Sequence, residues 1–267
     1  MKRLWVLVKQ VPATENVTMD EETGTMVRAG VEAVINPLDL YAVEEAIRIK
    51  EQSDEEVCVS VVSMGPPNAV EAIREAIAMG CDEGFLVSGR EFAGADTWAT
   101  AYTLSKALSS LGEFDLILCG ERATDGETGQ VGPMVGAMLA LPVLTYVSRI
   151  ELQDEENLMA KRAIEGGHEV VQCPIPALLS VVKEINEPRL PTLAGKISAR
   201  RMNVPVLTAE AIGADCALLG LTGSPTRVVQ VFYPTLTRTG EIVSTETSSV
   251  EECVDRLIEF LKASEVV

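Results

Sequence analysis

The stretch from Leu118 to Ala140, LCGERATDGETGQVGPMVGAMLA, holds the residues best suited to bind a ligand. An apolar, strand-like run, FDLILCG, leads through a glycine-containing loop into an apolar, helix-like segment. Backbone N–H groups in such a loop bind phosphate oxygens without a lysine side chain. We therefore expect a phosphate here, held by the N–H groups of Gly126, Glu127, Thr128, Gly129 and Gln130.

The side chains of the loop fit a nucleotide. Asp125 can accept hydrogen bonds from ribose or adenine, and Thr128 and Gln130 can donate to phosphate oxygens. On spacing alone, an ordinary strand-to-helix loop with Asp125 or Thr128 as a helix cap explains the pattern equally well. The loop contains neither G-K-[ST] nor G-x-G-x-x-G, so it is neither a magnesium triphosphate loop nor a dinucleotide fingerprint.

Other polar segments follow strands that should end at the same edge of a sheet. Lys9-Gln10-Val11 follows the first strand, Ser63-Met64-Gly65 follows the second, and Asn36 stands at a helix entrance. Singly, Asn36 is best explained as a helix cap and Met64 as a core residue. Ligands of open α/β sheets lie outside the carboxyl ends of the strands, so together these segments favour a nucleotide site.

Groups for acid–base or nucleophilic catalysis are missing. The only histidine, His168, lies in EGGHEV, where an exposed turn is expected, and the sequence has no G-x-S-x-G and no H-E-x-x-H. Its six cysteines form no C-x-x-C pair, so we expect reduced thiols and no metal site. The pattern predicts a protein that holds a cofactor, with no catalytic side chain.

Strands alternate with helices through the first half of the chain. Apolar runs predict strands at LWVLV, 56–65, 84–89, 114–120 and 142–147. Helices are expected from Asn36 as N-cap with Pro37 at the first position, from 68 to Gly80, and from Asp96 to Gly112. This rhythm predicts an α/β fold, a doubly wound, mostly parallel sheet.

The second half has a different rhythm. Alternation over 149–172 predicts an antiparallel hairpin, and 186–201 is expected to be an exposed loop. We expect a nucleotide-binding domain over 1–205 and a C-terminal arm over 206–267. The arm ends in an amphipathic helix capped by Ser248 or Ser249, with an apolar stripe of Val250, Cys253, Leu257 and Leu261.

Composition excludes several classes of protein. The chain has 267 residues, 47% of them hydrophobic, and 40 acidic against 22 basic residues, a net charge of -18. This charge argues against nucleic acid and anionic membranes as partners. The apolar run at the N-terminus is too short for a signal peptide, and no run has the length of a membrane span, so a cytoplasmic protein without membrane insertion is expected.

Several long motifs, in order along the chain, resemble the β subunit of electron-transfer flavoproteins. They are VKQVP, INPLDLYAVEEAIRIKE, VVSMGPPNAVEAIREAIAMGCDEG, DGETGQVGPMVG and KEINEPR, which run from Val8 to about Arg189, with weaker similarity through GLTGSPTRV. The resemblance implies an adenine-nucleotide fold of the hydrolase-like type and a heterodimer with an α subunit that carries FAD. It also implies that this subunit binds AMP, or a second FAD in flavin-bifurcating members.

The resemblance also implies which residues contact the nucleotide. Carried over by motif, they are Leu7, Asn36, Pro37, Leu38, Asp39, Met64, Arg122, Ala123, Thr124, Asp125, Gly126, Glu127, Thr128, Gly129, Gln130, Val131, Gly132 and Pro133. Segment 186–201 corresponds to the loop that docks on a flavin dehydrogenase, with Leu193 as its apolar anchor.

DGETGQVGP and GSPT resemble the bifurcating bacterial members, which implies FAD in this subunit and electrons taken from NADH. Two residues depart from the family pattern. Ala13 replaces a common Asp near the flavin end, and Leu190 replaces a common aromatic in the docking loop.

Three alternatives remain: an electron shuttle without bifurcation whose β subunit binds structural AMP, a stand-alone ATP-binding hydrolase, and a stress-type nucleotide sensor. The missing phosphate-loop lysine and metal ligands argue against the hydrolase. The docking-loop match and the long arm argue against the sensor.

Overall fold

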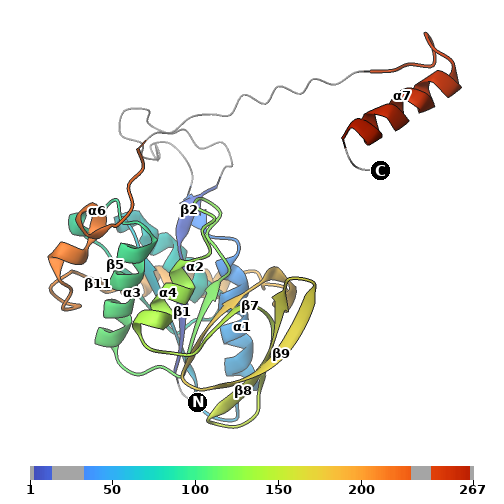
Figure 1. The fold of residues 1–267 in the computed structure, drawn as a ribbon. Coiled ribbons are helices and arrows are strands. Elements are labelled where there is room, and N and C mark those ends of the chain that lie inside the picture. Colours follow the sequence, from blue (N-terminus) through green and yellow to red (C-terminus); the bar gives the residue numbers. More distant parts are fainter. Residues whose placement is uncertain (1–2, 14–32, 230–241, 265–267) are drawn as a thin grey trace. The chain divides into compact units, whose positions relative to one another are not determined.

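A mostly parallel sheet of nine strands, in the order β11-β5-β4-β1-β6-β10-β7-β8-β9, forms the centre of the larger unit (Figure 1). The computed structural model describes residues 3–13, 33–229 and 242–264. The strands are β1 (Arg3–Leu7), β4 (Cys58–Met64), β5 (Glu83–Val87), β6 (Leu116–Gly120), β7 (Val143–Leu152), β8 (Asn157–Ile164), β9 (Gly167–Pro174), β10 (Ala177–Val181) and β11 (Val206–Leu207). A separate antiparallel pair is formed by β2 (Gln10–Pro12) and β3 (Ala33–Ile35). The predicted fold class is confirmed.

The centre of the sheet is buried on both faces. β1 lies between β4 and β6, parallel to both, with Trp5 level with Ser60 and Ile117. Continuous apolar runs suit strands that are covered on both sides, which is why these strands do not alternate in polarity.

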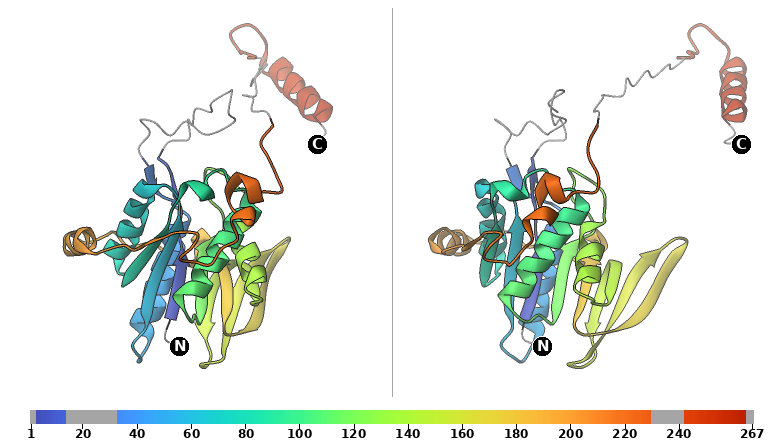
Figure 2. Two further views of the ribbon diagram at one scale, coloured as in Figure 1. Left: turned by 90° about the vertical axis from the view of Figure 1, so that its left-hand side faces the viewer. Right: turned by 60° about the vertical axis from the view of Figure 1, so that its left-hand side comes forward.

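Helices cover both faces (Figures 1 and 2). α1 (Asp39–Gln52) and α2 (Val70–Met79) pack against Leu4 and Val6, while α3 (Thr97–Leu111) and α4 (Val131–Met138) lie over Trp5. The expected ends are confirmed for α2, which stops at Gly80 with a φ of 142°, and for α3, which Asp96 caps by accepting the N–H of Ala99.

The antiparallel extension is larger than predicted. The expected strand 142–147 and the first arm of the hairpin 149–172 are one strand, β7, with an irregularity between Val147 and Arg149. β8 and β9 follow it as a meander, drawn in yellow-green and yellow in Figure 2. Because a bulge shifts the pleat without ending the strand, the change of period marks a bulge and not a boundary.

The predicted exposed loop over 186–201 is wrong in its second half. Residues Leu193–Arg201 form α5, and the side chain of Thr192 caps it by accepting the N–H of Gly195. A Cβ atom on Gly195 would lie 2.2 Å from the carbonyl oxygen of Ala78, so this glycine lets α5 lie directly on α2.

Segment 206–229, which the sequence pattern assigns to the arm, packs on the sheet. β11 pairs with β5, and Ala209, Ile212 and Leu219 are buried. The chain divides into the units Met1–Val229 and Gln230–Val267, so this division lies C-terminal to the expected one at 205.

The described part of the second unit contains α7 (Val250–Ala263). A capping box between Ser249 and Glu252 begins it, as expected, while parts of the predicted arm, 230–241 and 265–267, lie outside the described residues. Its apolar side chains are exposed, among them Val250, Val254, Leu257, Ile258 and Phe260. Within the described ranges, no helix has both the length and the apolar character needed to cross a membrane.

Candidate functional site

The candidate site lies where the order of the strands reverses. From β1 the chain adds β4 and then β5 on one side, and β6 on the other. The segments that follow β1, β4 and β6 therefore meet at one edge, which is where α/β sheets bind ligands.

Asn36 joins two of these segments. It is fully buried, its Nδ2 donates to the carbonyl oxygen of Arg122 at 2.9 Å, and its Oδ1 accepts the N–H of Thr124 at 3.2 Å. The predicted N-cap role is wrong, because α1 begins at Asp39 and follows Leu38, which makes no side-chain cap. The amide of Asn36 holds the loop after β6 instead.

Asp39 ties the ends of β1 and β6 together. Its Oδ2 accepts the N–H of Lys9 at 2.8 Å. Burial raises the pKa of the Asp39 carboxyl to about 7, although hydrogen bonds from Asn36, Lys9 and Gly120 oppose the shift. A Cβ atom on Gly120 would lie 2.5 Å from Oδ1 of Asp39, so only glycine allows this approach.

The loop from Glu121 to Gln130 uses two of the five predicted donors for its own turn. The N–H groups of Gly126 and Glu127 donate to the carbonyl oxygen of Ala123 at 3.3 and 2.8 Å, so in this structure they serve the turn. The turn closes because Glu127 adopts a left-handed φ of 52°.

The three remaining donors lie directly before the start of α4. In the part of the chain that the structure describes, the N–H groups of Thr128, Gly129 and Gln130 have no acceptor. Gly129 has a φ of 63°, and a Cβ atom built on Gly126 would meet no atom within 4 Å. The backbone is therefore open to a ligand next to unpaired donors, which is the arrangement that binds anions.

A cleft of about 80 Å³ lies at the ends of β1 and β4. It is lined by Lys9, Gln10, Val11, Pro12, Ala33, Met64, Gly65, Pro66, Asn68 and Ala69. The predicted site residue Met64 thus shares a cleft with the segment after β1. Ala13 is exposed at the end of this segment.

Lys9 connects the cleft with the loop after β6, and the sequence analysis did not single out its side chain. Its Nζ lies 2.6 Å from Oδ1 of Asp125, whose side chain is only 6% exposed. The loop itself has no lysine, but the fold brings one from β1. Its place directly after a buried strand, in VKQVP, was the available signal.

The other predicted residues fall into three groups. Leu7 is buried at the end of β1, and Pro37 and Leu38 form the turn before α1. Val131, Gly132 and Pro133 form the first turn of α4, where Pro133 has no N–H to leave unpaired.

Tyr146 was also missed. It has a φ of 57°, rare for an aromatic residue, and its side chain is 45% exposed. Its hydroxyl would lie 3.7 Å from a Cβ atom on Gly129, so β7 reaches the same loop. His168 lies exposed near the start of β9, away from these residues in the sheet order.

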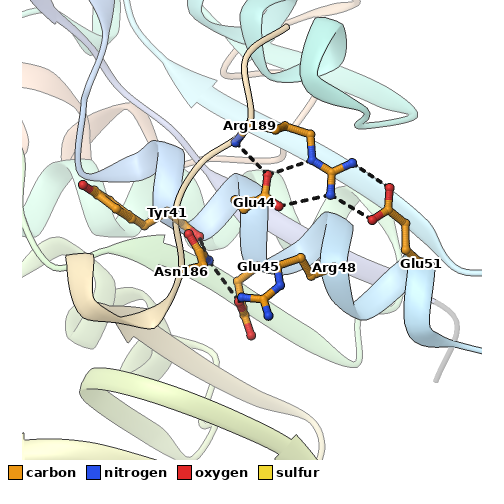
Figure 3. A network of polar contacts seen from close by, with 7 residues as sticks. All are labelled: Tyr41, Glu44, Glu45, Arg48, Glu51, Asn186 and Arg189. Carbon is orange, nitrogen blue, oxygen red and sulfur yellow. Dashed lines mark hydrogen bonds and ion pairs between the residues drawn. The ribbon is translucent and has the colours of Figure 1, made fainter. Parts of the chain in front are cut away.

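A second group of residues fixes the predicted docking segment (Figure 3). The guanidinium of Arg189 binds Glu44 through Nε at 2.8 Å and Nη2 at 3.1 Å, and Glu51 through Nη1 at 2.6 Å and Nη2 at 2.8 Å. Asn186 donates to the carbonyl oxygen of Tyr41 and to Glu45. The hydrogen bonds with Glu51 and Glu44 raise the pKa of Arg189, so it remains charged.

Beyond this network the segment presents apolar side chains to solvent. Leu190 is 87% exposed and Leu193 is 77% exposed, and Ile197 follows on α5. Exposed apolar side chains that form a contiguous patch are often found at protein–protein contacts.

The model of the electron transfer flavoprotein domain family matches residues 23–212. The chain is 44% identical to the electron transfer flavoprotein subunit beta of Thermoanaerobacterium thermosaccharolyticum, over 98% of each chain. It is 40% identical to the caffeyl-CoA reductase-Etf complex subunit CarD of Acetobacterium woodii, over 99% of this chain and all of the relative. It is 37% identical to the acryloyl-CoA reductase electron transfer subunit gamma of Anaerotignum propionicum, over 96% of this chain and 98% of the relative. The chain therefore belongs to the electron transfer flavoprotein family and is of its β-subunit type.

Proposed function

We propose that the carboxyl edge of the sheet binds the adenine-nucleotide part of FAD, with AMP as the alternative occupant. As a β subunit of this family, the chain works in electron transfer as a heterodimer with an α subunit. The observation that carries the cofactor proposal is the row of unpaired N–H groups at Thr128, Gly129 and Gln130 beside a cleft at the switch point.

The residues present fit such a group. Buried Asn36 and Asp39 form hydrogen bonds with the segments at the carboxyl edge of the sheet, so they shape the site rather than contact a ligand. The open backbone at Gly126 gives space for the ligand beside the backbone donors. Bound FAD would supply the redox chemistry, and this chain's residues bind and orient it.

The partner surfaces follow from the two exposed apolar groups. We assign α7 to the α subunit, because an amphipathic helix without a covering partner buries its stripe in another chain. Leu193 and its neighbours would dock on a flavin dehydrogenase. Two relatives carry the names of CoA reductase complexes, which supports a partner of that class.

Oxidation of NADH with bifurcation of its electrons is part of the proposal if this subunit holds FAD. The supporting observation is the sequence DGETGQVGP in the loop that carries the free donors. With AMP instead, the site would be structural and the heterodimer a one-flavin shuttle.

The first experiment counts nucleotides. The chain is purified with its natural α partner, denatured, and the released FAD and AMP are quantified by chromatography. Two FAD per heterodimer place a flavin in this subunit, and one FAD with one AMP makes AMP its occupant. One FAD without any AMP contradicts the proposed site.

A pair of glycine variants tests the loop. Gly129→Val places a β-branched residue at a φ of 63°, so the loop must change and nucleotide should be lost. Gly167→Ala, at the start of β9 and away from the site, is the control, because its Cβ meets only open space and its φ is not left-handed. Circular dichroism verifies that both variants are folded. Full nucleotide content in folded Gly129→Val would remove the loop from the site.

A further inference from the structure

The ion pair of Lys9 and Asp125 lies between the two parts of the proposed nucleotide site. Lys9 lines the cleft at the ends of β1 and β4, and among the described residues of that lining it is the one that carries a charge. Asp125 belongs to the loop that ends in the free N–H groups of Thr128, Gly129 and Gln130. The pair therefore joins the cleft to the backbone donors of the loop.

The backbone of Lys9 is fixed on both sides. Its N–H donates to Asp39 at 2.8 Å, and its carbonyl oxygen accepts the N–H of Asn36 at 2.8 Å. Because the backbone of Lys9 is hydrogen-bonded on both sides and its side chain is paired with Asp125, the ammonium group has few positions available. A lysine side chain that is already held in place loses less conformational entropy when it binds a ligand than a free surface lysine does.

The ammonium group of Lys9 can donate further hydrogen bonds. Lysine carries three donors, and in the part of the chain that is described one donor of Lys9 goes to Asp125. Lys9 keeps 43% of its side chain exposed while Asp125 keeps 6%, so the open side of the pair is the cation. An anion entering the cleft meets the lysine and not the carboxylate.

We propose that Lys9 donates to the phosphate of the bound nucleotide while Asp125 holds its ammonium group in place. Lys9 is then a specificity residue, which makes the site prefer a nucleotide 5′-phosphate over the uncharged nucleoside. This inference rests on the proposed function of the site and adds a side-chain cation to the backbone donors. Charge-assisted hydrogen bonds of this kind are stronger than neutral ones.

The experiment uses the heterodimer, stripped of nucleotide, and two probes, AMP and adenosine, in calorimetric titrations at low and high salt. Lys9→Met should weaken the affinity for AMP by about 10- to 100-fold and leave the affinity for adenosine nearly unchanged. The salt dependence of AMP binding should also become shallower, because one cation is lost. Lys9→Arg should restore most of the preference for AMP.

Two further variants separate the possible causes. Lys50→Met breaks the ion pair with Asp82, away from the cleft, and should change neither affinity. Lys9→Met with Asp125→Asn removes both charges, so repulsion by an unpaired Asp125 is eliminated. AMP affinity should stay low in this double variant.

The outcomes are distinct. Recovery of AMP affinity in the double variant would mean that Lys9 only neutralises Asp125, which overturns the inference. Equal loss of AMP and adenosine in Lys9→Met would also overturn it, since a structural role moves both. A wild-type heterodimer that takes up neither AMP nor FAD would instead refute the proposed function itself.

Discussion

At the residue scale, the edge of the sheet that holds the candidate site depends on the buried carboxylate of Asp39. The carboxyl group of Asp39 is 6% exposed, and burial raises its pKa to about 7. Its hydrogen bonds to Lys9 and Gly120 hold the ends of two strands together. Removing an ion from water costs free energy that such hydrogen bonds offset only in part.

This arrangement predicts a pH dependence of stability. The pKa of Asp39 is higher in the folded chain than in the unfolded chain, so the folded state binds the proton more tightly. The stabilisation is full at about pH 4 and is lost as the pH rises towards 7, by up to about 4 kcal/mol. Asp39→Asn should flatten this slope.

Urea unfolding of the wild type and the Asn variant at steps between pH 4.5 and 7.5 measures the difference. Glu45, whose pKa burial also raises, contributes in the same direction to both proteins and cancels in the comparison. Identical slopes for the two proteins would show that Asp39 is charged throughout.

Gly120 supplies a second prediction at this scale. Gly120→Ala puts a methyl group 2.5 Å from Asp39 and 2.8 Å from the backbone of Leu38, so α1 must move. We expect a loss of roughly 1–3 kcal/mol in the free energy of unfolding and a lower nucleotide content. Thermal unfolding with nucleotide quantification tests it, and Gly167→Ala on β9, with open space around its Cβ, is the matched control. Similar losses in both variants would contradict this explanation.

At the scale of elements, the network around Arg189 fixes one segment to one helix. Glu44 and Glu51 are two turns apart on α1, and the planar guanidinium reaches both with paired hydrogen bonds. The hydrogen bond from Arg189 lowers the pKa of Glu51. The chain thus enters α5 from an anchored point, with Leu190 and Leu193 displayed just beyond it.

We predict that Arg189→Ala loosens α5 while α1 stays folded. Glu44, 5% exposed, would lose its counter-charge, at a cost of roughly 1–3 kcal/mol after allowance for the partial exposure of Arg189. Amide hydrogen exchange over 190–201 should accelerate. Arg48→Ala, which removes a longer contact to Glu45 within α1, should leave this exchange unchanged. Unchanged exchange in both variants would refute the anchoring role.

Local patterns predicted most elements, and the failures have physical causes. Apolar runs and caps marked β1, β4, β5, β6, α2, α3 and α7, because each is determined by its own residues. α5 was missed since its sequence, LAGKISARR, has a weak apolar stripe and is held by α2 through Gly195. The boundary inside β7 was misplaced because a bulge mimics a turn.

At the scale of the whole molecule, the chain divides into two compact units. Residues 1–229 contain the sheet and the candidate site, and the described part of the second unit is mainly α7. The apolar stripe of α7 is exposed within its own unit, and its burial against the α subunit, as proposed above, would lower the free energy of the complex.

We predict that Leu257→Ser weakens the affinity for the α subunit by roughly 10- to 100-fold. Leu257 is 56% exposed on the apolar stripe, so the helix itself should persist. Glu259→Ser, on the opposite face, is the matched control and should bind as the wild type does. Surface plasmon resonance with immobilised α subunit gives both affinities, and equal values would remove α7 from the interface.

The site was predictable only in part at this scale. Strand ends and glycines placed the loop after β6 and the segments around Asn36 and Met64 at one edge, since topology follows from alternation. The roles within the edge were not predictable. That Asn36 bonds to Arg122, or that Lys9 meets Asp125, depends on side-chain contacts between residues far apart in sequence.

The small pair of strands β2 and β3 has a consequence for engineering. Pro12 pairs with Ala33, and both line the cleft, so residues 12 and 33 are held side by side at the rim of the site. Neighbouring attachment points of this kind suit an inserted domain whose own two ends lie close together. A fluorescent protein placed between residues 13 and 32 would be attached to the rim of the site on both sides. Its emission would then report nucleotide binding, which turns a cofactor-holding subunit into a sensor.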